Sequence, residues 1–459
     1  MPNNTKNVTI VGAGMAGTML AILLARRGYE IDLFEQHPHP HSGERSIELL
    51  SNLALGERAR HALAAAGLLE QVERLSTPMR GRMIHDRSGR LTLQPYGYRE
   101  YETLHSVRRE SLQLCLLYEA DKTECIRVHF DHKLEEVDWQ EQTAVFETRD
   151  NGGRLSHRFE VLIGADGPAS RVRREMEKAC DLQANIEMLD AGYKILTIPA
   201  DDMQQAVMDP NALHVWPRGG YMMVAFASPD GGFTANLFLP FKGDHRMIWG
   251  FRELDTWTRQ SAFMDANFPD VTPLMPDLET EFEENPVGKM GTVRLDRWHL
   301  DGKALLIGDA AHAIVPFHGQ GVNSALEDCT MLDGILENSS HSWESAFSTL
   351  QAQRKKDTDA IAEMALDAYR TVRESVRHRD FMLRKALERE LELRHPDQFV
   401  ARYSLVMFHR ISYTEAQERG RIQAGILDQL LENRQDLASV DMEHAAALVN
   451  ERLSVLAES

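Results

Sequence analysis

Residues 8–17 read VTIVGAGMAG, a short apolar run that leads into three glycines spaced G-x-G-x-x-G. A helical apolar pattern follows over Met19–Arg27 with Gly28 behind it, and a strand pattern covers Glu30–Glu35. A strand, a glycine turn, a helix and a second strand that ends in an acid make up a dinucleotide-binding βαβ unit. We therefore predict that the chain opens with such a unit.

The three glycines and the acid each have a separate task in this unit. Gly12 makes the tight turn, Gly14 lets the backbone approach a pyrophosphate, and Gly17 lets the helix pack closely on the strand. Glu35 comes 18 residues after Gly17, near the spacing expected for an acid that binds ribose hydroxyls. This motif alone leaves both NAD and FAD open.

Two further motifs follow much later in the chain. GADG spans residues 164–167, with Ser170 and Arg173 at fixed offsets behind it, and GDAAH spans residues 308–312. Each is a weak signal by itself, because Asp-Gly turns are common. Their order, near the start, one third and two thirds of the chain, predicts a single FAD that is wrapped by distant segments. Asp309 is expected to accept hydrogen bonds from the ribityl hydroxyls.

Several polar residues beside these motifs have both a functional and a structural interpretation. Arg109 opens a predicted helix, from which it either reaches over the flavin or remains a surface charge. The stretch 316–323 opens another helix, whose N–H groups would stabilise the anion of reduced flavin. His312 or His318 could be a general base, but a role in a turn or in a pocket wall is more typical.

Composition excludes other classes of function. The net charge of −19 argues against a nucleic-acid surface, which needs clustered Lys and Arg. The four cysteines lack Cys-x-x-Cys spacing, and the histidines at 37, 39 and 41 lack a nearby acid at ligand spacing, so no metal site is expected. No run of about 18 apolar residues is present. With no room for a signal peptide before Val8, a cytoplasmic protein is expected.

The strand and helix patterns give the domain organisation. Strands over 134–137, 143–148 and 158–164 predict a small sheet, and short strands over 191–249 predict an inserted antiparallel sheet that roofs a substrate pocket. Everything after about Gly321 is helical in pattern. The predicted fold class is α/β: a Rossmann-like FAD-binding domain, an inserted antiparallel β-sheet substrate domain and a C-terminal helical region. The predicted bounds are 1–185 with 290–350 for the first, 186–289 with a contribution from 75–105 for the second, and 351–459 for the third.

With all three motifs present, the chain resembles the group A aromatic hydroxylases, which are single-component FAD and NAD(P)H monooxygenases. Within that class it is most similar to the kynurenine 3-monooxygenase family. The stretches that carry this resemblance are spread over nearly the whole chain: 79–85 (MRGRMIH), 93–97 (LQPYG), 211–217 (NALHVWP), 315–321 (VPFHGQG) and 402–404 (RYS).

The resemblance implies a reaction. NADPH reduces FAD, the reduced flavin traps O2 as a C4a-hydroperoxide, and L-kynurenine is hydroxylated to 3-hydroxy-L-kynurenine beside its activating ring amine. No catalytic protein nucleophile is needed, because the protein positions the reactants and excludes water. The same chemistry on a related aminoaryl amino acid in secondary metabolism is the alternative. A flavin halogenase, an oxidase or a non-catalytic FAD-binding or NAD-binding regulator fits the sequence less well.

The resemblance also implies roles for individual residues. An Arg and a Tyr bind the substrate carboxylate and carry over to Arg82 and Tyr96; a guanidinium matches a carboxylate with two parallel hydrogen bonds. Arg80 would share a strand face with Arg82, so spacing alone does not choose between them. The remaining substrate-pocket residues are Phe238 and Tyr403, with His318 and Phe317 as positioning residues. The implied cofactor-binding residues are Gly12, Gly14, Met15, Ala16, Gly17, Glu35, Arg45, Arg109, Asp166, Asp309, Gly321, Val322 and Asn323.

The sequence departs from the family pattern at two places. The family's continuous Arg-Ser-Ile-Asn-Leu-Ala-Leu is split here into Arg45–Ile47 and Asn52–Leu55. An Asn that contacts substrate in the family is replaced by Ala368, which lacks the amide. These departures motivate the alternative substrate. A hydrophobic C-terminal anchor, as in the membrane-bound members of the family, is not expected, and the protein is expected to act as a monomer or homodimer on a small molecule.

Overall fold

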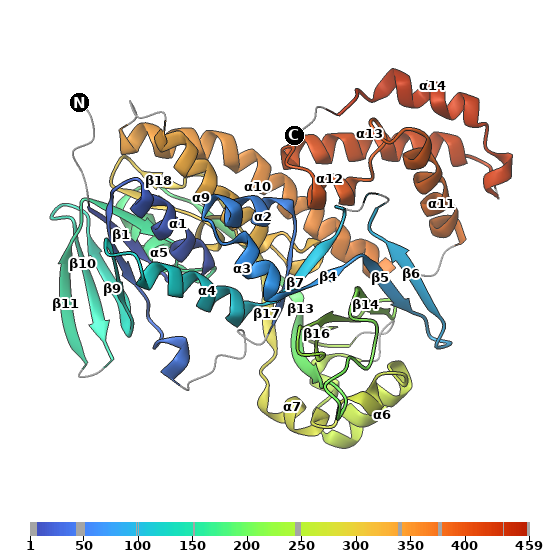
Figure 1. Ribbon diagram of the computed structural model, residues 1–459, viewed down its shortest axis with the longest axis horizontal. Coiled ribbons are helices and arrows are strands. Elements are labelled where there is room, and N and C mark those ends of the chain that lie inside the picture. The colour runs from blue at the N-terminus through green and yellow to red at the C-terminus, as the bar shows by residue number, and fades with distance from the viewer. Residues whose placement is uncertain are drawn as a thin grey trace.

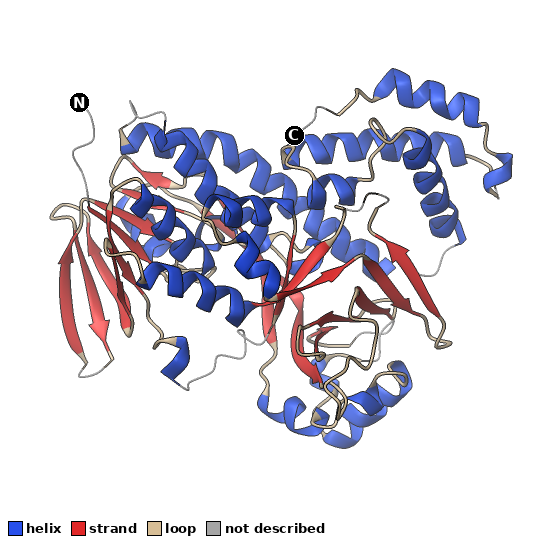
Figure 2. Ribbon diagram, in the orientation of Figure 1, coloured by secondary structure: helices blue, strands red, loops and turns tan. Residues whose placement is uncertain are grey.

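A computed structural model describes most of the chain, as an α/β assembly with a separate helical end (Figures 1 and 2). The strands of the described residues form four sheets. The described residues are 7–42, 51–97, 99, 101–149, 152–243, 249–337, 342–374, 379–434 and 436–456.

The central sheet has the strand order β18-β19-β12-β1-β2-β8 and is parallel except for the β18–β19 pair. Its middle strands are buried almost throughout, as expected for a parallel sheet that helices cover on both faces. The strands are β1 (Asn7–Val11), β2 (Glu30–Phe34), β8 (Ile126–His129), β12 (Val161–Gly164), β18 (His299–Leu300) and β19 (Ala304–Leu306).

The first helix confirms the predicted βαβ opening. α1 spans Met15–Arg26, so it begins four residues before the predicted start, directly behind the second glycine of the motif. It ends at Arg26, one residue before the predicted end, and Gly28 follows the C-cap with φ +83°, as predicted for the glycine behind the helix. The N–H groups of Gly28 and Tyr29 close the last turn on the carbonyls of Ala25 and Leu24.

The predicted small sheet is present, but one strand was wrongly assigned. β9 (His132–Asp138), β10 (Thr143–Thr148) and β11 (Gly153–Arg158) form an antiparallel sheet at one end of the molecule. The segment Val161–Gly164, predicted to belong to it, pairs instead in parallel with β1. All four of its residues are buried, which only the interior of the central sheet provides.

The inserted sheet is larger than predicted and not wholly antiparallel. Its order is β17-β13-β16-β15-β14-β5-β6, and the β14–β5 pair is parallel because β5 comes from an earlier part of the chain rather than from a hairpin. The strands are β5 (Gly81–His85), β6 (Leu91–Pro95), β13 (Ala184–Ile198), β14 (Ala212–Pro217), β15 (Met222–Ala227), β16 (Phe233–Pro240) and β17 (Gly288–Leu295).

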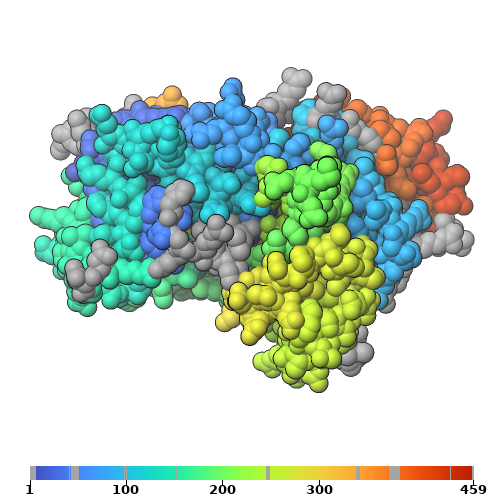
Figure 3. Space-filling view, turned by 60° about the horizontal axis from the view of Figure 1, so that its bottom comes forward, coloured from blue at the N-terminus to red at the C-terminus, as the bar shows by residue number. Residues whose placement is uncertain are grey.

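Two helices cover one face of this sheet. α6 (Trp257–Asn267) and α7 (Leu278–Glu284) pack on it through a shared apolar core that includes Phe263 and Phe282. Together they protrude as the yellow lobe at the bottom of the molecule (Figure 3). The opposite face of the sheet is therefore available to line a pocket.

A second small sheet and its helices lie beside these parts. Strands β3 and β4 both pair with β7 in an antiparallel manner. The elements are β3 (Asn52–Leu55), β4 (Ser76–Met79), β7 (Leu104–Arg108), α2 (Glu57–Ala65), α3 (Leu69–Arg74) and α4 (Arg109–Asp121). A further helix, α5 (Arg171–Ala179), packs against β9 and β12.

The end of the chain is helical, as predicted, and part of it forms a separate unit at the upper right of Figure 1. No helix in the described part of the chain is long and apolar enough to cross a membrane. The helices are α8 (Asp309–His312), α9 (Gly321–Glu337), α10 (Trp343–Glu374), α11 (Arg379–Arg394), α12 (Arg402–Phe408), α13 (Tyr413–Leu431) and α14 (Met442–Arg452). Short 3-10 turns occur at Pro40–Ser42, Phe251–Glu253, Thr272–Leu274, Pro316–His318 and Leu437–Ser439. The predicted fold class is confirmed.

Candidate functional site

One cavity of about 2400 Å³ runs between the glycine turn, the inserted sheet and the C-terminal helices. Pockets for one small ligand are usually about 300–1,000 Å³, so this cavity has room for a large cofactor and a substrate together. Most of the residues predicted for the site line it: Gly12, Gly14, Met15, Ala16, Glu35, Arg109, Asp166, Asp309, Gly321, Val322, Arg82, Phe238, Tyr403, Phe317 and His318. Gly17, Asn323 and Tyr96 do not, and Arg45 lies outside the described residues.

The three glycines of the first motif are required for different reasons. Gly12 has φ +102°, and a Cβ there would lie 2.5 Å from the carbonyl oxygen of Ala165. A Cβ on Gly17 would lie 1.9 Å from the carbonyl oxygen of Gly12. A Cβ on Gly14, in contrast, would meet nothing within 4 Å. Gly12 and Gly17 thus serve internal packing, and Gly14 leaves open space on the cavity wall.

The beginning of α1 suits an anionic group. Its N-cap, Gly14, offers no capping side chain, and the first turn contains no acid. The free N–H groups and the positive end of the helix dipole therefore face the cavity. Nearby, the Glu35 carboxylate accepts hydrogen bonds from the N–H groups of Ala13 and His37, both at 2.9 Å. Held in this way, the carboxylate keeps lone pairs for hydroxyl donors in the cavity.

The second motif is built around a helix cap. Asp166 accepts hydrogen bonds from the Ser170 hydroxyl at 2.5 Å and from the N–H of Arg171 at 2.6 Å, and burial raises the pKa of its carboxyl. Arg173 donates to the carbonyls of Pro168 and Ala310, at 2.7 and 2.8 Å. The fixed offsets of Ser170 and Arg173 are thereby explained: they cap α5 and join the second motif to the third.

The third motif is fastened by a buried charge cluster that the sequence did not reveal. Asp328 on α9 binds His312 Nε2 at 2.5 Å and accepts from the N–H of Gly308 at 3.2 Å and from Arg354 Nε at 2.7 Å. Burial opposes ionisation of Asp328, but the charges of His312 and Arg354 hold its pKa below the usual value. His312 does not line the cavity, so its structural interpretation is the one that the geometry supports.

At the start of α9, Gly321 and Val322 face the cavity while Asn323 turns away. The Asn323 side chain accepts from the N–H of Gly56 at 2.8 Å and donates to the carbonyls of Ala54 and Gly319, at 2.9 and 2.8 Å. It thus holds β3 and the start of α2 against α9. A contact of Asn323 with a cofactor remains a prediction.

A cluster of aromatic rings surrounds Arg82 in the part of the cavity next to α12. The guanidinium carbon lies 4.2 Å from the ring centre of Tyr403 and 5.6 Å from that of Tyr96. The Tyr96 hydroxyl is buried beside them and forms no hydrogen bond of good geometry with the described residues. Arg80 is exposed and lies outside the cavity, so the structure distinguishes the two arginines that spacing left open.

His318 is a neutral side chain in this chamber. Burial, together with the positive charges of Arg402 and Arg82, lowers the pKa of its imidazole to about 3. Its ring stacks on Tyr403 with the centroids 5.4 Å apart. The adjacent Phe317 contacts Phe238 at a centroid distance of 5.1 Å. These rings make a largely apolar wall in which His318 does not act as a charged group at neutral pH.

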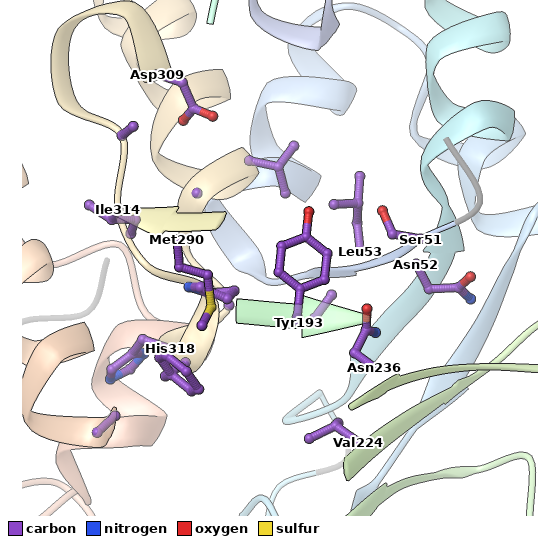
Figure 4. Close-up of a pocket in the computed structure, with 18 of the residues that line it drawn as sticks. Ser51, Asn52, Leu53, Tyr193, Val224, Asn236, Met290, Asp309, Ile314 and His318 are labelled. Carbon is purple, nitrogen blue, oxygen red and sulfur yellow. The ribbon is translucent and has the colours of Figure 1, made fainter. Parts of the chain in front are cut away.

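The inserted sheet forms one wall of the cavity, called its floor below, with residues that the sequence analysis did not predict. Tyr193 on β13 and Asn236 on β16 both project into the space between His318 and β3 (Figure 4). Alternation along a strand placed them on one of two faces, but no motif indicated which face lines the cavity. Ala368, at the position where the family pattern has Asn, also lines the cavity.

The split family motif keeps its second half as a cavity wall. The Asn52 amide donates to Ser106 Oγ, to the Ala227 carbonyl and to Ser228 Oγ, at 2.9, 3.0 and 3.1 Å, which fastens β3 to the inserted sheet. Leu53, which follows it, then faces the cavity (Figure 4).

Comparison with known proteins identifies the family of the chain. A family model described as FAD binding domain matches residues 5–368. Kynurenine 3-monooxygenase of Xanthomonas axonopodis pv. citri (strain 306) is 42% identical over 460 residues, with 99% of each chain covered. The enzyme of the same name from Myxococcus xanthus (strain DK1622) is 40% identical, covering 97% of this chain and 95% of the other.

Solved structures show the same fold at lower identity. The tetrameric form of 2-methyl-3-hydroxypyridine-5-carboxylic acid oxygenase has a TM-score of 0.66 at 19% identity and covers 82% of this chain and 94% of that one. PqsL of P. aeruginosa, solved in complex with 2-aminobenzoylacetate, has a TM-score of 0.61 at 20% identity and covers 81% of this chain and 97% of that one. The chain belongs to the FAD-binding domain family and, within it, to the kynurenine 3-monooxygenase family of FAD-dependent aromatic monooxygenases.

Proposed function

We propose that this FAD-dependent aromatic monooxygenase hydroxylates L-kynurenine to 3-hydroxy-L-kynurenine with NADPH and O2 as co-substrates. One observation carries the proposal: a single cavity joins the glycine turn of the FAD-binding family to the chamber of Arg82 and Tyr403. The family and the named relatives support the choice of substrate.

The residues present fit FAD. The open space over Gly14 and the uncapped start of α1 would take the diphosphate, and Glu35 would bind the ribose. Arg109, Asp166, Asp309, Met15, Ala16, Gly321 and Val322 would contact the rest of the cofactor. When bound and reduced by NADPH, FAD supplies the activated oxygen that reaches the ring. In this proposal the FAD-binding domain comprises residues 1–185 and 290–350. The domain that covers the substrate comprises residues 186–289 with a contribution from 75–105, and the helical region that closes the site comprises residues 351–459.

The Arg82 chamber would hold the amino-acid end of the substrate. A guanidinium presents two parallel N–H groups to a carboxylate, and Tyr96, which lies behind Arg82 and outside the cavity lining, would hold the guanidinium in place. The aromatic rings around the guanidinium would exclude water from its contact with the carboxylate. This contact would fix the direction in which the substrate enters. The aryl ring would then lie between Phe238, Phe317 and the floor that Tyr193 provides.

The chain's own groups position the reactants rather than attack them. His318 is neutral and stacks on Tyr403, so it shapes the chamber without adding a charge beside the substrate. The hydroxyl–carboxylate pair of Ser88 and Asp86, at 2.6 Å, lies on the exposed turn between β5 and β6 and stabilises that turn.

A related aminoaryl amino acid is the second candidate substrate. Ala368 on the cavity wall offers a methyl group where the family pattern has an amide, so one hydrogen bond to the ligand is missing and there is more room. A cytoplasmic location and a monomer or homodimer remain predictions from the sequence.

The test is NADPH oxidation by the purified yellow protein, with L-kynurenine and with a panel of aminoaryl acids that carry extra ring substituents. We expect L-kynurenine to stimulate oxidation most and to give a product heavier by one oxygen. Stronger stimulation and hydroxylation with a substituted analogue would favour the second candidate. Stimulated oxidation that yields only peroxide would make L-kynurenine an effector and contradict the proposed substrate.

A further inference from the structure

The Arg402 side chain packs in a space on α13 that only a glycine at position 420 leaves open; this space is called the Arg402 seat below. Arg402 is the first residue of α12, and its methylene stem lies directly on Gly420 in the middle of α13. A Cβ on Gly420 would lie 2.4 Å from Arg402 Cδ and 2.9 Å from Cγ. Glycine inside a helix costs roughly 0.5–1 kcal/mol relative to alanine. The space above Gly420 is therefore explained by the side chain that fills it.

From this seat the Arg402 guanidinium reaches the cavity without a partner. Arg402 lines the cavity and makes no hydrogen bond or ion pair with any described residue. It also lies close enough to His318 to lower the pKa of that imidazole, more strongly than Arg82 does. A half-buried guanidinium without a counter-charge keeps a desolvation cost that an anionic ligand would offset.

Other cations of the same region already have partners. Arg384 and Lys385 on α11 also line the cavity, but Arg384 pairs with Asp428, and Lys385 pairs with Glu388. Arg82 is enclosed by tyrosine rings deeper in the chamber. Among the residues that the structure describes, Arg402 is thus the cation left to meet a new anion between the α11–α13 arm of the cavity and Arg82. This arm is lined by Arg384, Lys385, Glu388, Gly420, Gln423, Ala424 and Leu427.

We propose that Arg402 binds the carboxylate of the incoming aromatic amino acid and passes it to Arg82. This inference rests on the proposed function, because it takes Arg82 as the final carboxylate site. The seat on α13 and the influence on His318 place Arg402 between the arm and the chamber. An anionic group that enters along the arm meets Arg402 before it reaches the ring of Tyr403.

An entry role predicts a change in the association rate rather than in the chemical step. A charge that steers a ligand raises the association rate by about 10-fold or more, and salt screens the effect. Arg402→Gln is expected to lower the association rate constant of L-kynurenine by about tenfold and to flatten its dependence on ionic strength. Because an entry role acts before the substrate is bound, the association rate is expected to fall by a larger factor than the rate of flavin reduction at saturating substrate.

The experiment is stopped-flow binding to the FAD-loaded enzyme, followed by flavin absorbance at low and at physiological ionic strength. The ligands are L-kynurenine and its decarboxylated analogue, which keeps the ring, the ketone and the amine. The control variant is Arg421→Gln on the next residue of α13, which removes the same charge from a side chain that is 60% exposed and outside the cavity. A loss confined to Arg402→Gln and to the carboxylate ligand supports the proposal. An equal loss with the decarboxylated analogue, or none with either ligand, overturns it.

Gly420→Ala gives a second variant in case Arg402→Gln folds poorly. It keeps the charge and favours the helix, but it displaces the Arg402 stem, so the same selective loss of association rate is expected. Unchanged association in a folded Gly420→Ala protein would contradict the role of the seat.

Failure of the proposed function gives a different result. If L-kynurenine neither binds nor stimulates NADPH oxidation in the wild-type enzyme, the substrate assignment is wrong. The comparison of the variants is then made with the aminoaryl acid of the panel that does bind. The effect on that acid decides the role of Arg402 independently.

Discussion

Asp328 is the buried group whose removal should affect the fold and the cofactor site together. It is fully buried and holds Arg354, His312 and the backbone of Gly308 at once. Asp328→Asn keeps the size of the side chain but removes the charge, and an amide group that donates hydrogen bonds would face groups that also donate. Arg354, which is 1% exposed, would keep only Glu327 and Asp357 as counter-charges.

The expected cost follows from this burial. Breaking a buried ion pair by removing one partner costs about 3–5 kcal/mol, and the remaining carboxylates place this case at about 3 kcal/mol. An unfolding entropy of about 2.1 cal/mol/K per residue gives about 1 kcal/mol/K for a chain of this length. The midpoint of thermal unfolding of the apoprotein should therefore fall by about 3 °C. FAD should also bind more weakly, because the turn that carries Asp309 is no longer fastened.

A double-mutant cycle separates this network from simple loss of packing. Asp328→Asn, Arg354→Met and the double variant are compared by thermal unfolding of the apoprotein and by FAD titration. The double variant should be less destabilised than the sum of the singles by about 2 kcal/mol. Asp255→Asn, which breaks an exposed pair with Arg259, is the control and should cost less than about 1 kcal/mol. Additive single effects, or a cost of Asp328→Asn no larger than that of the control, would refute the reasoning.

Other consequences of the structure can be measured directly. Arg82→Ala should raise the substrate KM by about 10- to 100-fold, equivalent to about 1.5–3 kcal/mol, while FAD stays bound; an unchanged KM would remove Arg82 from the site. Gly17→Ala should destabilise the apoprotein, because its Cβ would overlap the Gly12 carbonyl, whereas Gly14→Ala should leave the thermal midpoint alone and weaken FAD binding. Equal effects of the two glycine variants on the apoprotein would contradict their separate roles. Burial and nearby acids raise the pKa of Glu392 from 4.5 to about 7, so its protonated form favours folding; the stability that it contributes is complete below pH 4.5 and is lost as pH rises to about 7. Denaturant titrations should show this loss in the wild type and not in Glu392→Gln, and the same pH dependence in both proteins would exclude Glu392 as its source.

Local pattern was enough to predict the parts of the molecule that depend on neighbours in sequence. The strand, the glycine turn and the helix over residues 7–26 follow from burial and from the space that each glycine leaves. The helical end after Gly321 follows from periodicity. In both cases the residues that decide the structure lie within a few turns of each other, so the signal is in the sequence itself.

The pattern of apolar residues could not predict which strands pair when they lie far apart in the sequence. Val161–Gly164 is an apolar run of four residues, too short to reveal whether it lies in a small sheet or beside β1. The parallel pairing of β5 with β14 joins segments that are more than a hundred residues apart. Only packing of the whole inserted sheet decides these neighbours.

The site shows the same limit. Spacing made Arg80 and Arg82 equal candidates for the carboxylate-binding residue. The structure distinguishes them, because residue 80 lies between two strands and outside the cavity, whereas residue 82 lies on β5 and lines the cavity. Asp328 and Tyr193 carry no motif, and Arg402 opens the family stretch 402–404 without a role that the sequence assigns; each of the three owes its role to contacts with another element. Sequence could identify the cofactor end of the cavity, where the motifs are local, better than the substrate end, where walls from distant segments meet.

The most direct test of the proposed function is a turnover with 18O2, in which the FAD-loaded enzyme, NADPH and L-kynurenine are mixed and the product is analysed by mass and NMR. The account predicts one labelled oxygen in 3-hydroxy-L-kynurenine, on the ring carbon beside the amine, with NADPH consumed in step with product. An unlabelled hydroxyl, a hydroxyl elsewhere on the ring, or NADPH consumed with only peroxide formed would contradict it.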